Sequence, residues 1–240
     1  MLDPVIHFLG SILATAYALI PNLGLAIILL TVIANIAVLP LTLKQVRSMA
    51  ALQEMQPQLK DLQREHKDDR SKLNEATVAL YKEKGVNSAS GCLPMLVQLP
   101  IWWSLFRLLR SFRAVDGLDP TRYLPQASKL SAAILGGHTT FLPGMDLVTS
   151  PREAVANGMV GAIPYLIVAA FIIIGGYFQQ RQTTRRHQPD GGQSRTPPQQ
   201  QMQTITKVMP VLFGFISYSL LLGVDLYIAA SQVIRISQQA

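Results

Sequence analysis

The chain has 240 residues, of which 49% are hydrophobic and only 15% are charged, with a net charge of +7. This balance argues against a soluble protein. Because the basic residues lie in segments between apolar stretches, it also argues against a nucleic-acid-binding surface. A single cysteine, Cys92, leaves no partner for an intrachain disulfide. No Lys or Arg occurs in residues 1–22, so we expect no secretory signal peptide there.

Two apolar stretches open the chain. The first, residues 5–20, is short and interrupted by polar residues. We interpret residues 1–22 as an external amphipathic helix in the membrane interface, with a weakly hydrophobic extra span as the alternative. Residues 23–43 carry no charge, and 21 residues of helix reach about 30 Å, the thickness of a hydrocarbon core. We predict a first transmembrane helix there, since a backbone in lipid must satisfy its own hydrogen bonds.

Residues 44–90 are highly charged, with nine Lys/Arg and seven Asp/Glu between Lys44 and Lys84. Apolar residues recur every three or four positions on both sides of a polar turn at residues 66–69, which predicts an antiparallel helical hairpin. Pro57 is expected to break or restart its first arm. The hairpin either only connects two spans or also docks partners. The basic residues that we expect to contact a client or the ribosome are Arg47, Lys60, Arg64, Lys67 and Arg70.

Further spans follow the hairpin. We predict a second span at residues 91–112. Pro94 is tolerated in the first turn of this helix, whereas Pro100 should kink it. Residues 113–158 predict an external loop with turns at Gly136-Gly137 and at Leu142-Pro143-Gly144, to which we assign no function.

The last third of the chain contains two more apolar stretches. Residues 159–180 predict a third span. Arginines, paired glycines, paired prolines and a run of glutamines in residues 181–204 predict a flexible basic cytoplasmic loop. Residues 208–236 are long for one span and short for two, although the turn-like Leu222-Gly223-Val224-Asp225 suggests two. Because no Lys or Arg precedes Lys44, the positive-inside bias places the N-terminus outside and both basic loops in the cytoplasm.

Short motifs occur in order along the chain. They are NLGLAII at 22–28, LPLT at 39–42, MQP at 55–57, ALYK at 79–82, GCLPMLVQLPI at 91–101, KVMP at 207–210 and GVDLY at 223–227. Together they resemble the bacterial YidC-type members of the YidC/Oxa/Alb family of membrane protein insertases, over roughly residues 20–238.

The resemblance implies an all-α membrane protein with a five-helix transmembrane core, a cytoplasmic hairpin and a cytoplasmic C-terminus. It resolves residues 208–236 as two spans, 205–220 and 224–238. It also implies a multi-pass protein of the bacterial inner (plasma) membrane, without enzymatic activity or cofactor. Such a protein takes nascent membrane proteins into a hydrophilic groove open to the cytoplasm and releases their apolar segments into the bilayer. Its further partners would be lipids, the ribosome and the Sec translocon, but not DNA.

The resemblance also selects site residues. The family places an arginine in the groove in its first span, and counting from LPLT puts Asn35 at that position. Thr31 lies one turn earlier on the same face. Asn35 either lines the groove or holds the bundle together through an interhelical hydrogen bond of about 0.6–2 kcal/mol. The residues that we expect to line the groove are Thr31, Asn35, Gln98, Ser217, Ser231 and Gln232.

Asp225 is a possible extra polar site, because the family has an apolar residue there. We expect its carboxylate near the outer interface, where it stays hydrated, and a deeper position would make it a functional candidate. Our hypothesis is a groove that is hydrophilic without being cationic, so that clients with strongly acidic translocated segments are handled poorly.

Two other functions are alternatives to insertion. A small transporter or channel would need paired intramembrane charges and internal repeats, and the sequence offers neither. A degenerate insertase that acts only as a folding chaperone is the second alternative. An enzyme is not indicated, because no Ser/His/Asp grouping is present and the histidines lack metal-ligand spacing.

Overall fold

The computed structural model describes residues 2–66, 69–85, 93–113, 118–186, 208 and 211–239, most of them in helices. The chain folds into two compact units. The first, which we call the core unit, comprises Met1–Asn35 and Pro100–Ala240. The second, which we call the hairpin unit, is Ile36–Leu99. The expected all-α class is confirmed, with one short two-stranded sheet inside the region predicted as the external loop.

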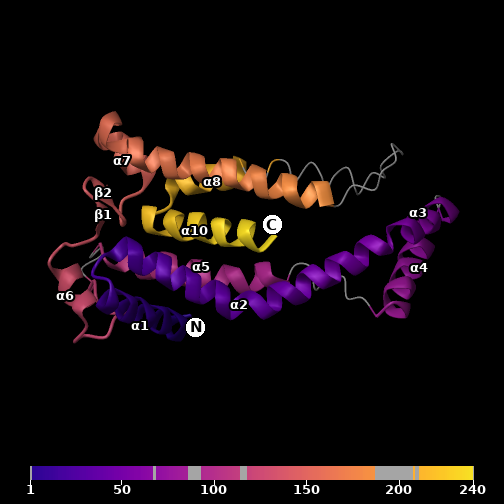
Figure 1. The fold of residues 1–240 in the computed structure, drawn as a ribbon, viewed down its shortest axis with the longest axis horizontal. Helices are drawn as coiled ribbons and strands as arrows, with labels where there is room; N and C mark the ends of the chain where they lie inside the picture. The colour runs from indigo at the N-terminus through magenta and orange to yellow at the C-terminus, as the bar shows by residue number, and fades with distance from the viewer. Residues whose placement is uncertain are drawn as a thin grey trace. The chain divides into compact units, whose positions relative to one another are not determined.

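The core unit begins with α1 (Asp3–Leu19), whose first turn contains Pro4. Proline is tolerated there because the first amides of a helix have no partner within it. The buried face of α1 includes Ile6, Leu9, Leu13 and Tyr17, spaced by three or four residues. α1 packs on α6 (Lys129–Leu135), so protein covers much of the apolar face of this helix (Figure 1).

Three helices meet tightly at the beginning of α10 (Leu222–Gln239). A Cβ atom at Gly223 would lie 2.7 Å from Leu109 Cδ1 of α5 (Leu93–Ser111) and 3.2 Å from Ile27 Cδ1 of α2 (Leu23–Glu54). Glycine removes this conflict and lets the helices approach. In α5, Pro94 lies in the first turn, as expected, and Pro100 lies inside the helix.

The predicted external loop is structured. After α6 come β1 (Thr140–Leu142), β2 (Met145–Asp146) and α7 (Pro151–Asn157). The turns expected there are present, with positive φ at Gly137 (74°) and at Gly144 (82°) between the two strands. Arg113 Nη1, beyond the end of α5, donates to Glu153 Oε1 of α7 at 2.9 Å, which ties this loop to the helical bundle.

α8 (Met159–Arg186) extends past the predicted end at residue 180. Residues 181–186 are therefore helical and not part of a flexible loop, because they are mostly Gln, Arg and Thr, with no Gly or Pro to end the helix. Residues 187–204 of that loop lie outside the described residues. One face of α8 is buried, including Tyr165 and Ile172, whereas another exposes apolar side chains. These exposed residues include Val160, Ile163, Ile167 and Ile174.

The stretch 208–236 contains two described helices, and the break between them lies just before the turn-like residues 222–225. Residues 211–219 are helical, the helix breaks at residues 220–221, and α10 begins at Leu222, so the expected turn at 222–225 is wrong. The amides of Leu222 and Gly223 donate to Thr149 O (3.0 Å) and Leu147 O (2.8 Å). These bonds satisfy donors at the helix N-terminus that would otherwise lack partners, so the helix can begin at that point.

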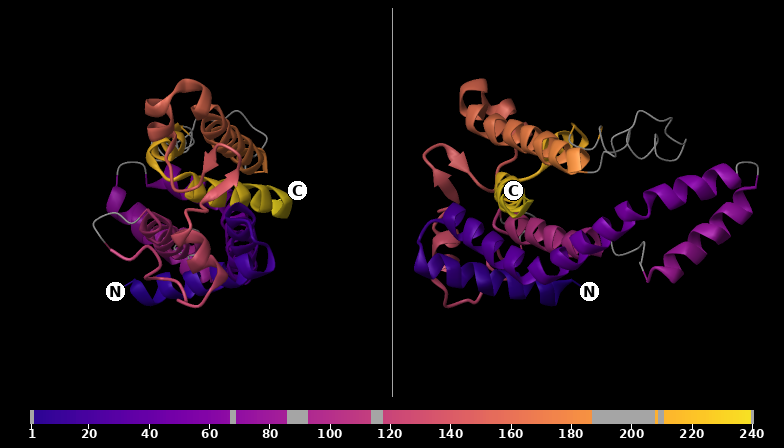
Figure 2. Two further views of the ribbon diagram at one scale, coloured as in Figure 1. Left: turned by 90° about the vertical axis from the view of Figure 1, so that its left-hand side faces the viewer. Right: turned by 45° about the vertical axis from the view of Figure 1, so that its right-hand side comes forward.

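α8 and α10 lie side by side and run in the same direction (Figures 1 and 2). Both beginnings are held by the segment 145–149. The Tyr165 hydroxyl, early in α8, accepts a hydrogen bond from the Asp146 amide at 2.8 Å. The first amides of α10 bind Leu147 and Thr149, as described above.

Two described helices have the length and hydropathy of membrane spans: Leu23–Lys44 and Met159–Gln182. Only 33% and 28% of their most apolar windows are buried within the protein. Soluble monomers rarely expose continuous apolar surfaces of this kind, so lipid is the natural environment of these faces. Among the described residues, two of the five expected spans thus meet this criterion.

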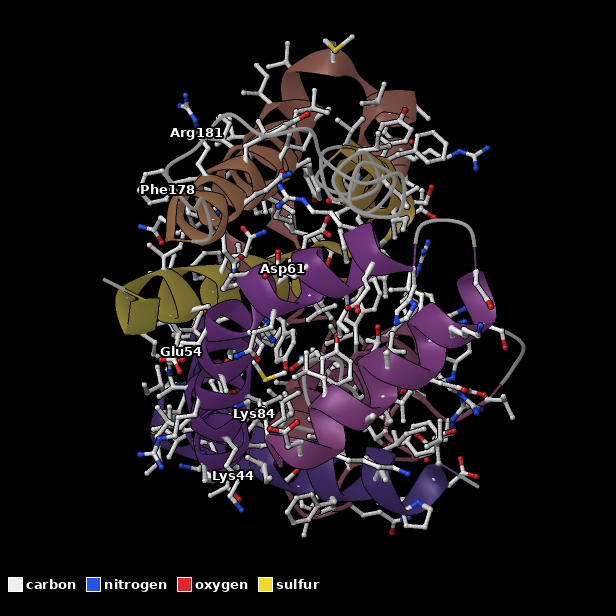
Figure 3. The ribbon with its side chains drawn as sticks, turned by 90° about the vertical axis from the view of Figure 1, so that its right-hand side faces the viewer. Lys44, Glu54, Asp61, Lys84, Phe178 and Arg181 are labelled. Atoms are coloured by element: carbon white, nitrogen blue, oxygen red, sulfur yellow. The ribbon has the colours of Figure 1, made fainter. Side chains whose placement is uncertain are left out.

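The hairpin unit contains the expected helical hairpin. α3 (Gln56–Glu65) restarts with Pro57 in its first turn, as predicted, and packs on α4 (Arg70–Glu83). Asp69 caps α4, since its Oδ1 accepts from the amides of Ser71 and Lys72, each at 3.1 Å. Figure 3 shows Asp61 of α3 and Lys84 at the end of α4, which line a cavity of about 300 Å³.

α2 extends further into this unit than the predicted first span, which ended at residue 43. It continues to Glu54 with Pro40 inside it. Residues 44–54 are mainly Lys, Gln, Arg, Met, Ala and Leu, all good helix formers, so no sequence signal ends the helix earlier.

Candidate functional site

Thr31 of α2 is fully buried. Its Oγ1 donates to the carbonyl oxygen of Ile27, one turn earlier, at 2.7 Å. This local bond satisfies the hydroxyl within its own helix. In the structure, the Thr31 hydroxyl hydrogen is therefore already used within α2. The groove-lining role of Thr31 stays a prediction.

Asn35 connects α2 with α10. Its Nδ2 donates to Thr31 O at 2.8 Å and to Ser231 Oγ at 3.2 Å. Asn35 is half-buried and Ser231 is buried. The structure thus brings two of the predicted residues together in the interhelical hydrogen bond expected for a structural role, while part of Asn35 remains exposed.

Gln232 connects α10 with α8. Its Nε2 donates to the carbonyl oxygen of Ile172 at 3.2 Å. Its Oε1 is buried and has no hydrogen-bond partner among the described residues. A Cβ atom at Gly175 would lie 2.7 Å from this Oε1, so glycine at position 175 makes room for the amide.

Asp225 is the one charged side chain among those that the structure describes as buried, and it is 0% exposed. The expected hydrated position is therefore wrong. Its carboxyl group interacts with Ser217, which is also buried. The contact falls short of hydrogen-bond geometry, so both carboxyl oxygens and Ser217 Oγ lack partners within the described part of the chain. The cause is the early start of α10, which places Asp225 in the first helical turn, three positions after the amide bound by Thr149.

Several predicted residues cannot be joined to this group. Gln98 is half-buried in the hairpin unit. In the same unit, Arg47 is exposed, and so is Arg64, whose Nη1 lies 3.7 Å from Asp61 Oδ1. Lys67 lies outside the described residues, as do the side chains of Lys60 and Arg70.

Two polar groups of α5 were missed by the sequence analysis. Ser104 Oγ and Trp102 Nε1 are buried without partners among the described residues. The Trp102 ring lies 6.3 Å from the Phe213 ring, which connects α5 with the helix 211–219. Ser104 had a usable signal, since it is a polar residue inside a predicted span, as Ser217 and Ser231 are.

Acidic groups of the loop between α5 and α8 differ from Asp225, because they have partners. Burial by itself would raise the pKa of Glu153, but hydrogen bonds from the Ser150 amide and Arg113 bring that pKa below its ordinary value of 4.5. Hydrogen bonds from the Thr121 hydroxyl and amide, both 2.7 Å long, lower the pKa of Asp119.

The chemistry of this group of residues is hydrogen bonding. On α10 and the helix 211–219 the unsatisfied atoms are the Asp225 carboxyl, Gln232 amide and Ser217 hydroxyl oxygens, which can accept hydrogen bonds from another molecule. No group of His, Cys, Asp and Glu that could hold a metal ion is found in the described ranges. We therefore take Asn35, Ser217, Asp225, Ser231 and Gln232 as the candidate site and call it the interior polar site.

Comparison with known proteins gives one family match over most of the chain. The model of the family described as "60Kd inner membrane protein" matches residues 15–240. A solved structure described as an active YidC insertase with its first transmembrane domain resolved is similar, with a TM-score of 0.61 and 26% sequence identity. The similarity covers 98% of this chain and 45% of that one.

Curated relatives carry related names. The membrane protein insertase YidC of Fusobacterium nucleatum is 35% identical over 173 residues, 68% of this chain and 80% of the relative. The YidC of Endomicrobium trichonymphae is 48% identical over 108 residues, 43% of this chain but only 21% of the relative. The chloroplastic ALBINO3-like protein 2 of Chlamydomonas reinhardtii is 35% identical over 217 residues, 90% of this chain and 48% of the relative. The chain thus spans less than half of several relatives that it matches.

Proposed function

Because this chain belongs to the 60Kd inner membrane protein family, whose similar members are named membrane protein insertases, we propose that it inserts nascent membrane proteins into the bilayer. The chain is accordingly a membrane protein. Its clients are membrane proteins during synthesis. The ribosome and the Sec translocon are proposed as neighbours, with Arg47 and Arg64 as exposed basic contacts.

The observation that carries this proposal is the distribution of polar and apolar groups in the core unit. α8 exposes an apolar face, with Ile167 at 62% and Val160 at 82% exposure. The interior contact between α8 and α10 instead contains the Gln232 amide, and Ser231 and Asp225 lie nearby on α10. Such an arrangement suits a protein that faces lipid outside and offers hydrogen bonds to a polar client segment inside.

The driving force comes from the client. An apolar client helix gains free energy when it moves from water into lipid. Its polar flank opposes this movement, because an unpaired polar group in an apolar environment costs several kcal/mol. Side chains such as Asn35 and Ser231 can exchange their mutual hydrogen bond for bonds with the client. This exchange lowers the barrier without ATP.

We propose a topology with the N-terminus outside, the hairpin helices α3 and α4 in the cytoplasm and α6, β1, β2 and α7 outside. Cysteines introduced by Arg64→Cys in α3 and Leu135→Cys in α6, each in a Cys92→Ser background, report the sides. In intact cells, a membrane-impermeant maleimide should label position 135 and not position 64. Labelling of position 64 alone would contradict the topology.

Reconstitution tests the function. The purified full chain in liposomes should insert a single-span client, measured as the protease-protected fraction, well above liposomes without protein. A small transporter would instead show solute flux and no client insertion. Protection equal to that in protein-free liposomes would contradict the proposal.

The composition of the interior polar site gives a sharper test. Asn35 carries no charge, so a client with an acidic translocated tail should insert less well than the same client with a neutral tail. Asn35→Arg should reduce this difference, because a guanidinium group attracts carboxylates. Equal insertion in all four combinations would exclude a role of position 35 in client selection.

A further inference from the structure

Among the described residues, the Asp225 carboxyl group interacts with the Ser217 side chain, without hydrogen-bond geometry. Asp225 is 0% exposed, and neither oxygen accepts a hydrogen bond. A buried carboxylate without a partner is strongly destabilising, and intramembrane acidic residues are normally paired or functional. A hydrogen-bond donor would satisfy these oxygens, because an ionised carboxylate only accepts and a protonated carboxyl group still has an oxygen that accepts.

In the described part of the chain, no charged group contributes an interaction to Asp225. On α10, Arg235 is ten residues away, about 15 Å along the helix, and it has its own interaction. Arg107 and Arg110 of α5 are exposed. Arg113 is bound to Glu153, and Arg122 lies over the ring of Tyr123.

Ser217 adds a second unsatisfied group to the same place. Its Oγ is buried and unpartnered, and its side chain is the one that interacts with the Asp225 carboxyl group. A hydroxyl oxygen and two carboxyl oxygens together suit a ligand with several hydrogen-bonding hydrogens. Ammonium and guanidinium groups have three and five such hydrogens and also carry the complementary charge.

The helix 211–219 supplies the side chain that interacts with Asp225. In the helix 211–219, Gly214 and Ser217 are buried, whereas Val211, Leu212 and Phe215 are exposed. Gly214 packs closely on Ile173 of α8, and Phe213 contacts Trp102 of α5. Because Ser217 belongs to this helix, a movement of the helix would separate Ser217 from Asp225 and free both groups for a client segment.

We propose that Asp225 and Ser217 bind a positively charged side chain, lysine or arginine, of a client segment during insertion. This inference rests on the proposed insertase function and names the client feature that the interior polar site selects. Gln232 follows Asp225 by seven residues, about 10.5 Å on the same face of α10, and its spare Oε1 offers the next acceptor along the path.

The test uses one single-span client whose translocated tail carries Lys, Gln or Glu at one position. Insertion into liposomes with the full chain is measured for each tail, and the Lys-to-Gln ratio is compared between variants. Asp225→Asn should lower this ratio about tenfold, which corresponds to a loss of about 1.4 kcal/mol in the binding free energy of the lysine. Asp225→Glu keeps the charge and should preserve the ratio within about twofold. Ser217→Ala should lower it by about threefold.

Glu75→Gln, on the exposed surface of α4, is the matched control and should leave the ratio unchanged. Gel filtration and the thermal midpoint establish that each variant is folded. If Asp225→Asn does not fold, Ser217→Ala provides the test by itself. A ratio that neither variant lowers overturns this inference while leaving the insertase function intact. Failure of all three clients to insert with the unmodified chain overturns the proposed function instead.

Discussion

Two parts of the interior polar site differ in how well their hydrogen bonds are satisfied. Where α2 meets α10, Asn35 donates to both Thr31 and Ser231. Where the helix 211–219 meets the beginning of α10, Asp225 and Ser217 are fully buried and unsatisfied within the described residues. The first part has the character of a contact that holds helices together. The second has a cost in stability that only a further partner offsets, which is typical of a functional site.

The largest expected effect concerns Asp225. Asp225→Asn keeps the shape of the side chain and removes the charge, so it should stabilise the chain by about 1–3 kcal/mol, because a neutral amide costs less to bury than an unpaired carboxylate. Thermal unfolding in detergent measures this change. Asp61→Asn, on the surface, should stay within about 0.5 kcal/mol. Destabilisation by Asp225→Asn would mean that the carboxylate already has a hydrogen-bond partner. The two parts of the interior polar site would then not differ in how well their hydrogen bonds are satisfied.

The contact between α2 and α10 should behave in the opposite way. Asn35→Ala and Ser231→Ala should each destabilise the chain, and a double-mutant cycle should give a coupling of about 0.6–1.7 kcal/mol, the range for interhelical hydrogen bonds in membranes. A coupling near zero would show that the 3.2 Å contact between Asn35 Nδ2 and Ser231 Oγ contributes nothing to stability.

Gly175 tests the contact between α8 and α10. Gly161→Ala, in the same helix and with nothing within 4 Å of the new Cβ, should stabilise by about 0.5–1 kcal/mol. Gly175→Ala should lack this gain, since its Cβ would press on Gln232 Oε1. Its free energy of unfolding should be about 1 kcal/mol lower than that of Gly161→Ala. Equal midpoints for the two variants would show that Gln232 moves away at no cost.

The smallest expected effect is the pH dependence of the loop contact between Arg113 and Glu153. The pKa of Glu153 is lowered in the folded state, so its contribution is complete above its ordinary value of 4.5 and is lost as the pH falls through the lowered pKa. With 40% of the Glu153 side chain exposed, we expect less than about 1 kcal/mol. Glu153→Gln should abolish this part of the pH dependence, and an unchanged profile would contradict the assignment.

Much of the fold was predictable from the sequence because its signals are local. The charge-free stretch 23–43 and the apolar residues 159–180 lie in the two helices whose hydropathy suits a membrane. Pro57 and the polar turn at 66–69 defined the hairpin correctly. The helix ends were not predictable in the same way, since good helix formers allow α2 and α8 to continue past their apolar parts.

The interior polar site was only partly predictable. Asn35 and Ser231 were selected, and they form a hydrogen bond. The burial of Asp225 was missed because it depends on the segment 147–149, which lies far away in sequence and supplies the carbonyl groups that start α10 early. Trp102 was missed because hydropathy treats an indole as apolar and ignores its N–H group.

The most direct test of the account is a crosslink between the interior of the bundle and a client during insertion. A cysteine introduced by Ser231→Cys, in a Cys92→Ser background, should form a disulfide with a cysteine in the polar flank of a stalled client. A cysteine introduced by Leu135→Cys, which lies exposed on α6, should not. Insertion that proceeds without any crosslink at position 231 would contradict passage of the client along α10.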